Sequence, residues 1–355
     1  MIKVLGLALY GPMAASTRYR LGQYVPGLAE RGIALDIRYL LDDNYLQQRF
    51  NGGPMPWLNL LQTGWQRLRE LRSESENFDL SIVYCELFPL LPAWAEYALL
   101  PKPYVYDFDD AFYLKYQGGR LGVMRPILGR KFDAVIAGAA AVSAGNQTLA
   151  GYARGLNTRT RLLPTVVDTG RYVPIPNSRD ATTFTVGWIG SPSTAPYLAE
   201  LIAPLALIAR EGPVRLVVIG GKAPLIPGVR VDEVAWNEDT EIALLNSFDV
   251  GVMPLTDDEW ARGKCAFKLI QYMACAVPVI ASRVGANVDV VSPDCGYLAS
   301  SEQEWVAALR ILRDQPERRK TMGEAARTRV VQQYSLHSNL PMLEEIIRLA
   351  AEQGE

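Results

Sequence analysis

Three cations stand close together in the segment EWARGKCAFKLIQYMA, residues 259–274. Arg262, Lys264 and Lys268 lie just ahead of, or within the first turns of, an expected helix, where the helix dipole is also positive. Their mutual repulsion is unfavourable unless an anion joins them, so their spacing predicts a diphosphate ligand. A solvated basic face is the alternative, and the apolar residues between these cations disfavour it.

A second candidate phosphate loop is GWIGSPSTAPYL. Gly190 ends an expected strand, and Ser191 and Thr194 precede a helix, so backbone N–H groups and hydroxyls can converge on a phosphate. The same residues are also typical of an ordinary helix N-cap.

A third loop, LYGPMAASTRYR, follows the first expected strand and lacks the G-x-G-x-x-G pattern of dinucleotide-binding proteins. Gly11 permits close backbone approach, and Arg18 and Arg20 stand nearby, which favours an acceptor or phosphate contact. Solvated arginines on a first helical turn are the alternative.

Carboxylates crowd one turn in VYDFDDAFY, where Asp107, Asp109 and Asp110 follow a strand. Their repulsion raises at least one pKa toward the range useful for proton transfer. An aspartate that caps the loop is the alternative.

Composition excludes several classes of function. The 355 residues carry a net charge of -2, so no basic field indicates a nucleic-acid partner. Four cysteines without a C-x-x-C pair and a single histidine, His337, disfavour a metal site and a histidine-based triad, and they favour a reduced cytoplasmic protein. The apolar start MIKVLGLALYG resembles a first strand more than a secretory signal, and no stretch has the roughly 18 to 20 apolar residues of a membrane span.

Alternating strands and helices predict an α/β fold with two Rossmann-like halves. The expected strands of the first half are 2–9, 33–40, 79–84, 104–106 and 134–137, and those of the second half are 184–190, 214–221, 248–254 and 277–282. The proline-rich stretch 162–176 marks the boundary. We therefore predict an N-terminal acceptor domain over 1–170, a donor domain over 171–335, and a C-terminal helix over 336–355 that packs back toward the first domain.

KLIQYMACAVPVIAS resembles the K-L-x-E-Y-M-A-x-G-x-P-V-I-A-S segment of the retaining glycosyltransferases of the GT-B fold, family 4 (glycosyl transferases group 1). LLPTVVDTGRYVP and RKTMGEAARTRVVQQYSL are similar to two further segments of that family, in the same order. The resemblance implies two Rossmann-like domains facing each other across a cleft. It also implies transfer of a sugar from a nucleoside diphosphate sugar to an acceptor hydroxyl, with retention at the anomeric carbon.

Donor-binding roles follow from the same resemblance. Lys268 matches the lysine that contacts the diphosphate and acts on the leaving group, and Gln271 matches a glutamate that binds the ribose hydroxyls. Because glutamine lacks the charge, each ribose hydrogen bond should be weaker, and Gln271→Glu is expected to keep or tighten donor binding. The family's upstream glutamate is replaced by Gly263, and whether Glu259 or another group substitutes for it stays open.

Three more roles are implied. Arg262 and Lys264 are expected to supply cations that the family places in the loop matching GWIGSPST. Trp236, in VAWNEDTE, occupies the loop that meets the nucleobase, although a core indole is the alternative. Asp109 stands where relatives often have a histidine, so we expect it to orient the acceptor hydroxyl and draw off its proton.

The expected partners are a nucleotide sugar, with UDP favoured over GDP, and a glycan or lipid-linked glycan acceptor in polysaccharide biosynthesis. No cofactor and no metal are expected. Residues 54–72, with Trp57, Leu58, Leu61 and Trp65 among arginines, indicate peripheral contact with an anionic membrane at the inner face of the cell membrane. An amphipathic helix packed on the first sheet is the favoured alternative. A sugar-nucleotide 2-epimerase and a non-catalytic two-domain binding protein are the rival functions.

Overall fold

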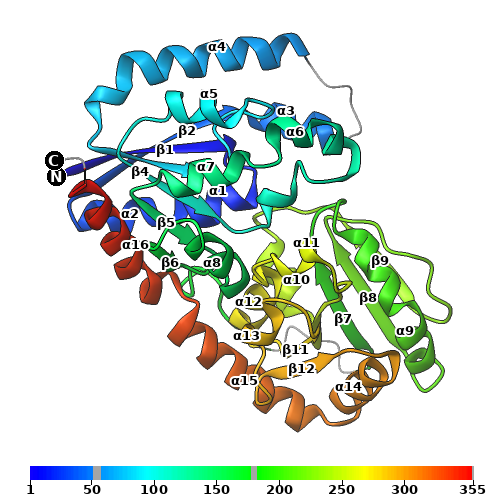
Figure 1. The fold of residues 1–355 in the computed structure, drawn as a ribbon. Helices are drawn as coiled ribbons and strands as arrows, with labels where there is room; N and C mark the ends of the chain where they lie inside the picture. The colour runs from blue at the N-terminus through cyan, green and yellow to red at the C-terminus, as the bar shows by residue number, and fades with distance from the viewer. Residues whose placement is uncertain (51–56, 177–181, 354–355) are drawn as a thin grey trace. The chain divides into compact units, whose positions relative to one another are not determined.

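The computed structural model describes residues 1–50, 57–176 and 182–353. Contacts divide the chain into two compact units, Met1–Thr165 with Asn339–Glu355, and Val166–Ser338. The sequence prediction set these divisions after residues 170 and 335. Each unit is a parallel six-stranded sheet with helices, which is the architecture predicted from the sequence (Figure 1).

The sheet of the first unit has the strand order β2-β1-β3-β4-β5-β6. Its strands are β1 (Ile2–Tyr10), β2 (Ile33–Leu41), β3 (Leu80–Tyr84), β4 (Tyr104–Phe108), β5 (Ala141–Ala144) and β6 (Thr160–Leu162). Its helices are α1 (Ala15–Arg20), α2 (Val25–Glu30), α3 (Asp43–Phe50), α4 (Trp57–Glu74), α5 (Ala93–Leu99), α6 (Arg125–Leu128), α7 (Lys131–Ala137) and α8 (Gln147–Arg154). The continuous apolar runs in β1 and β3 are buried, as expected for parallel strands covered on both faces.

The sheet of the second unit has the order β12-β11-β10-β7-β8-β9. Its strands are β7 (Phe184–Ile189), β8 (Val214–Ile219), β9 (Arg230–Val234), β10 (Val250–Met253), β11 (Val279–Ser282) and β12 (Gly296–Ala299). Its helices are α9 (Ile202–Ala209), α10 (Glu241–Asn246), α11 (Glu259–Arg262), α12 (Phe267–Ala274), α13 (Asn287–Val290), α14 (Glu302–Asp314) and α15 (Pro316–Gln333). A core built around Trp188, Leu205 and Leu309 joins this sheet to α9 and α14.

Each sheet has a point at which the chain changes its direction of travel across the strands. In the first unit this point lies between β1 and β3, and in the second unit it lies between β7 and β10. Loops leave a parallel sheet on opposite faces at such a point, and the crevice outside the carboxyl ends of the strands is where ligands bind. The loops after these strands are therefore the place to look for a site.

The last helix, α16 (Leu336–Ala351), returns to the first unit, to which Asn339–Glu355 belong. Arg31 forms an ion pair with Glu344 at 2.6 Å, and a Cβ at Gly27 would meet Leu340 at 2.5 Å. Because Gly27 has no side chain, α16 packs closely against α2.

One predicted strand is wrong. Residues 134–137 lie in helix α7, and the strand of that region is β5, at Ala141–Ala144. A short buried apolar run has the same hydrophobicity in a helix as in a strand, so periodicity cannot separate the two.

Helix α4 packs on the first sheet through the face that carries Arg67 and Leu71, both of which are buried. The Arg67 guanidinium donates to the carbonyl oxygens of Ala8, at 3.2 Å, and Arg38, at 3.1 Å. Trp65 is 70% exposed. Residues 54–56 and the side chains of Trp57, Leu58 and Leu61 lie outside the described part of the chain. Within that part, no helix is both long and apolar enough to cross a bilayer.

Candidate functional site

Two aromatic rings set the position of α12 beside the switch point of the second sheet. Phe248 and Tyr272 pack edge to face with centroids 6.1 Å apart. A Cβ at Gly187 would meet the Phe248 ring at 1.9 Å, and one at Gly251 would meet Tyr272 at 2.2 Å. The Tyr272 hydroxyl accepts the Ile189 N–H at 2.9 Å. Gly251 thus lets α12 pack directly on β10, and Gly187 makes room for the Phe248 ring that packs against Tyr272.

Lys268, in the first turn of α12, reaches across to the loop after β7. Its Nζ atom donates to the Thr194 hydroxyl at 3.1 Å and lies 4.1 Å from the centroid of the Trp188 ring. A Cβ at Gly190 would lie 2.6 Å from the same Nζ atom. Three residues singled out from the sequence, Gly190, Thr194 and Lys268, therefore meet at the carboxyl ends of β7 and β10.

Ser191 shapes the loop that holds Thr194. The Ser191 carbonyl accepts the N–H of Thr194 at 2.9 Å and that of Ala195 at 3.2 Å, and its hydroxyl pairs with the Ser193 hydroxyl at 2.8 Å. These contacts form a tight turn that directs Thr194 toward Lys268. They fit both a phosphate-binding loop and a helix start.

Gln271 and Trp236 meet at a residue that sequence reasoning missed. The Gln271 Nε2 atom donates to Glu241 at 2.9 Å and to the Tyr172 hydroxyl at 3.1 Å, and Trp236 and Tyr172 also donate to the Glu241 carboxyl. Glu241 stands in the acidic run NEDTE, where its sequence neighbours are exposed, so nothing in the sequence marked it as buried.

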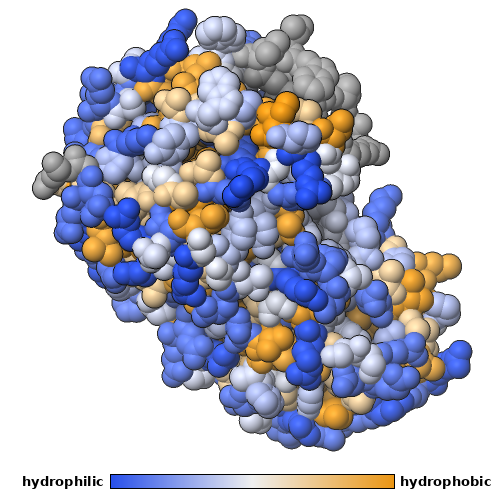
Figure 2. All heavy atoms as spheres, in the orientation of Figure 1, coloured by the Kyte–Doolittle hydropathy of each residue, from blue (hydrophilic) through white to orange (hydrophobic). Residues whose placement is uncertain are grey.

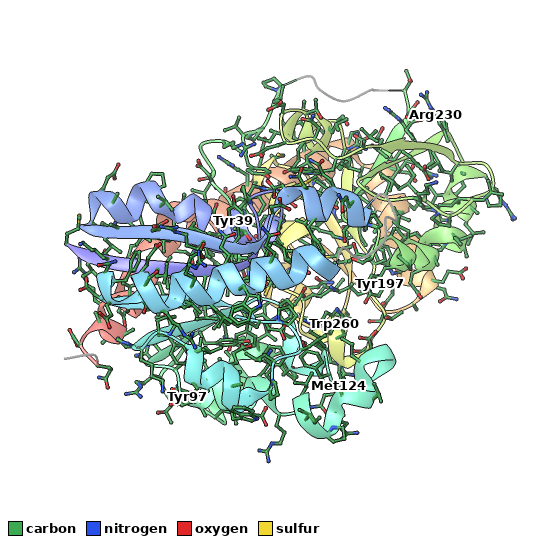
Figure 3. All side chains as sticks on the ribbon, turned by 90° about the horizontal axis from the view of Figure 1, so that it is seen from above. Tyr39, Tyr97, Met124, Tyr197, Arg230 and Trp260 are labelled. Carbon is green, nitrogen blue, oxygen red and sulfur yellow. The ribbon has the colours of Figure 1, made fainter. Side chains whose placement is uncertain are left out.

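The predicted cation cluster is only partly assembled. Arg262 is 52% exposed and donates to Asp257 at 2.7 Å, and this hydrogen bond raises the pKa of Arg262. The Lys264 Nζ atom lies 5.9 Å from the ring of Trp260, which is labelled in Figure 3. The expectation that only a ligand anion relieves the repulsion is wrong for Arg262, because Asp257 supplies a carboxylate.

In the first unit, Asp109 lies just beyond β4. Its carboxylate accepts the Tyr84 hydroxyl at 2.5 Å and the Thr165 hydroxyl at 3.3 Å. Burial raises the pKa of Asp109 above its ordinary value. Burial and the nearby Asp109 also raise the pKa of Tyr84, which keeps that hydroxyl a donor. A carboxylate whose pKa is raised is a better proton acceptor than an ordinary aspartate.

Arg20 does not lie at a ligand loop. It is buried in an ion pair with Asp107, and it donates to Ser143 at 3.1 Å, to Thr165 at 3.3 Å and to the Leu163 carbonyl at 2.7 Å. The prediction of a phosphate contact for Arg20 is therefore corrected. Its sequence position suggested a first-turn arginine, but the helix turns it inward toward β4.

A carboxylate of the protein itself, that of Asp43, lies in the loop after β1. The Asp43 carboxylate accepts the Met13 N–H at 2.9 Å, and a Cβ at Gly11 would lie 2.6 Å from the same oxygen. Arg18 donates to the carbonyls of Pro12, at 2.9 Å, and Met13, at 2.7 Å. Gly11 does permit a close approach, but the approaching anion in this structure is Asp43.

A second buried charge network, also missed from the sequence, lies beyond β3. The Lys131 Nζ atom pairs with Glu86 and Glu96, each at 2.7 Å, and Lys115 and Tyr116 also bond Glu86. Burial acts to raise the pKa of Glu86, but Lys115 and Lys131 together lower it below its ordinary value. Burial raises the pKa of Glu96.

A cavity of about 740 Å³ in the second unit opens beyond the ends of β10, β11 and β12. Leu255, Asp257, Ser282 and Trp305 are among the residues that line it, whereas Lys268 and Gln271 are not. Within the described ranges, no group of three His, Cys, Asp or Glu side chains is placed to hold a metal ion.

Comparison with known proteins identifies the fold and gives a family match for part of the chain. Residues 183–315 match the family described as glycosyl transferases group 1. The chain is similar to sucrose-phosphate synthase (tll1590) from Thermosynechococcus elongatus, with 17% identity, a TM-score of 0.74 and 98% of each chain covered. No curated protein sequence matches the chain.

Two further structures have the same fold. The Anabaena Alr3699/HepE complex with UDP-glucose has 14% identity and a TM-score of 0.68, covering 98% of this chain and 100% of that one. WaaG, a glycosyltransferase involved in lipopolysaccharide biosynthesis, has 16% identity and a TM-score of 0.65, covering 98% and 99%. The GT-B fold and the resemblance to group 1 glycosyltransferases predicted from the sequence are thereby confirmed.

Proposed function

We propose that this chain, which has the GT-B fold and matches glycosyl transferases group 1 over residues 183–315, transfers a glycosyl group from a nucleoside diphosphate sugar to an acceptor hydroxyl. The observation that carries the proposal is the meeting of Lys268, Thr194 and Gly190 at the switch point of the second sheet. A fixed ammonium beside a glycine loop is suited to a diphosphate.

The proposed chemistry depends on stabilising the leaving group. The bond between the anomeric carbon and the diphosphate oxygen breaks, its electron pair stays on the diphosphate, and Lys268 stabilises the growing charge more than it stabilises the ground state. The acceptor oxygen forms the new bond to the anomeric carbon. We assign retention of configuration and independence of a metal to this reaction on the basis of the resemblance.

The acceptor proton passes either to Asp109 or to the departing phosphate. The raised pKa of Asp109, caused by burial, supports the first route. The Tyr84 hydroxyl, at 2.5 Å, and the Thr165 hydroxyl hold the carboxylate in place. Asp109 is thus the proposed acceptor-orienting base.

UDP is the favoured nucleotide. Alr3699/HepE, which has the same fold, is described in complexes with UDP and UDP-glucose, and this supports a uridine nucleotide here. A glycan or lipid-linked glycan acceptor, and a role in polysaccharide biosynthesis on the cytoplasmic side of a membrane, complete the proposal.

We propose that the membrane contact lies on residues 121–130 rather than on α4, whose buried Arg67 faces the sheet. Val123 is 81% exposed and Ile127 is 60% exposed, beside the exposed Arg125 and Arg130. The chain has no acidic residue between Asp110 and Asp133, although Asp133 pairs with Arg130 at 3.0 Å. Figure 3 marks Met124 on this segment, and Figure 2 shows hydrophobic residues in separate groups among hydrophilic ones on the displayed face. Apolar side chains flanked by arginines suit an anionic bilayer.

Flotation with vesicles tests this contact. The wild-type protein should float with vesicles that contain phosphatidylglycerol and less with phosphatidylcholine alone, and the Val123→Ser, Ile127→Ser double variant should lose most of the binding. Equal flotation of the two proteins would remove the proposed surface.

The activity itself is tested by incubating the protein with UDP-, GDP- and ADP-sugars and measuring free nucleoside diphosphate and glycosylated product. A transferase releases the nucleoside diphosphate when it transfers the sugar to an acceptor. Without an acceptor it releases the diphosphate only slowly, as water takes up the sugar. A 2-epimerase instead changes the sugar, and a binding protein returns the ligand unchanged. A thermal-shift screen identifies the base, because a ligand at 100 times its Kd stabilises by about 2.7 kcal/mol.

A further inference from the structure

Glu241 is a buried carboxyl group that accepts hydrogen bonds from three neutral side chains. Its exposed fraction is 3%. The Tyr172 hydroxyl and the Gln271 Nε2 atom donate to one of its oxygens, and the Trp236 indole N–H donates to the other. A buried carboxylate needs such donors, so these three side chains are held in a fixed arrangement around it.

The arrangement fixes which way the Gln271 amide points. The Nε2 atom donates toward Glu241 at 2.9 Å and toward the Tyr172 hydroxyl at 3.1 Å, two acceptors that are themselves hydrogen-bonded to each other. The reversed amide would put its oxygen 2.9 Å from a Glu241 oxygen, and two acceptors repel each other at that distance. The Oε1 atom of Gln271 is therefore left as the acceptor for a ligand.

We propose that Glu241 is a positioning residue for the donor ribose. It holds the Gln271 amide with Oε1 toward the ribose hydroxyls, and it also fixes the Trp236 indole. The proposal rests on the proposed nucleotide-sugar site. An amide that donates to a carboxylate becomes a stronger acceptor at its oxygen, because hydrogen bonds in a chain polarise one another. Gln271 itself carries no charge, but the negatively charged Glu241 carboxylate accepts a hydrogen bond from its amide.

This arrangement reverses the expectation for Gln271→Glu. The new carboxylate would face Glu241 at the distance now held by a hydrogen bond, so the two charges would repel each other and donor binding should weaken. Exchanging the two residues, in the Glu241→Gln, Gln271→Glu double variant, restores an amide facing a carboxylate. The Trp236 N–H can then donate to the amide oxygen at position 241.

Calorimetric titration with UDP and with 2′,3′-dideoxy-UDP tests the proposal. Glu241→Gln should weaken UDP binding about three- to tenfold, the loss of one good hydrogen bond, and Gln271→Glu should weaken it more than about tenfold. The double variant should recover to within a few-fold of wild type. Dideoxy-UDP should bind all four proteins with much smaller differences. Glu238→Gln, whose carboxylate pairs with Arg171 at the surface, is the matched control and should bind like wild type.

Three results would overturn the proposal: single variants that bind UDP like wild type, a double variant that binds no better than the weaker single variant, or equal losses for UDP and dideoxy-UDP. Thermal unfolding of the four proteins without ligand gives a reading that does not depend on function. Non-additive melting temperatures, with recovery in the double variant, support the contact between Glu241 and Gln271, and additive ones contradict it. If the melting temperatures support the contact but no nucleoside diphosphate binds the wild-type protein, the proposed function is wrong, and so is the ribose role of Glu241.

Discussion

Gly190 leaves the space that the Lys268 ammonium occupies: a Cβ at position 190 would lie 2.6 Å from Nζ and 2.5 Å from the Trp188 ring. A Cβ there would force both groups to shift, and the lysine, which is the more flexible of the two, would lose its present position. The position of the Lys268 ammonium beside the loop after β7 therefore depends on the absence of a side chain at position 190.

We expect Gly190→Ala to weaken binding of a nucleoside diphosphate about 10- to 100-fold, because overpacking costs about 1–3 kcal/mol and displaces Lys268. Binding of the nucleoside without phosphates should change little. Isothermal titration with UDP and with uridine measures both. Equal losses for the two ligands would point to general misfolding of the loop.

Lys268→Ala should lower turnover by about two to three decades, as removal of one oxyanion-hole donor does. The exposed Lys320→Ala, in α15 of the same unit, is the charge-matched control and should keep wild-type turnover. Steady-state kinetics on the folded variants measures both turnover numbers. An unchanged turnover number in Lys268→Ala would show that Lys268 does not stabilise the leaving group.

Asp109→Asn should leave nucleotide affinity intact and depress sugar transfer, because it removes the charge while nearly preserving shape. Asp110→Asn, on the same turn, separates the effect of this position from the effect of loop charge. If Asp109→Asn transfers sugar at the wild-type rate, or if both variants lose activity equally, Asp109 is not the base.

The same variant tests a pH dependence of stability. The folded pKa of Asp109 is raised by burial from the ordinary value of 3.8. The stability that its protonated form contributes is thus complete below about pH 3.8 and is lost as pH rises through the folded pKa. Urea unfolding across this window should show wild type losing stability relative to Asp109→Asn as pH increases. A difference that stays constant with pH would contradict the raised pKa.

Lys131→Met should destabilise the first unit by about 3–5 kcal/mol, because it leaves Glu86 and Glu96 buried without their shared cation. Lys115→Met, which removes the partly exposed partner of Glu86, is the control and should cost less. Chemical denaturation gives both values. A smaller loss in Lys131→Met than in Lys115→Met would show that the buried lysine is not essential to the network.

Local sequence was sufficient for the repeated strand-helix alternation, and hence for the two Rossmann-like units, because buried parallel strands are continuous apolar runs wherever they occur. It also placed Gly190 and Thr194 in a loop after a strand and Lys268 at the start of a helix, whereas the contact between Lys268 and Thr194 came from the tertiary structure. Residues 134–137 show the limit, because a run of four apolar residues has no period long enough to distinguish helix from strand.

Only the tertiary structure decided which charged residues are paired and buried. Arg20 and Arg18 stand two positions apart in one helix, yet one is enclosed with Asp107 and the other holds a surface loop. Glu241 and Glu238 belong to one acidic run, yet one organises Gln271 and the other pairs with Arg171 at the surface. Glu241 and Gln271 are 30 positions apart along the chain, and Arg20 and Asp107 are 87 apart, so local sequence contains no signal for these pairs. The energy of a buried charge depends on those distant donors and on the water they exclude.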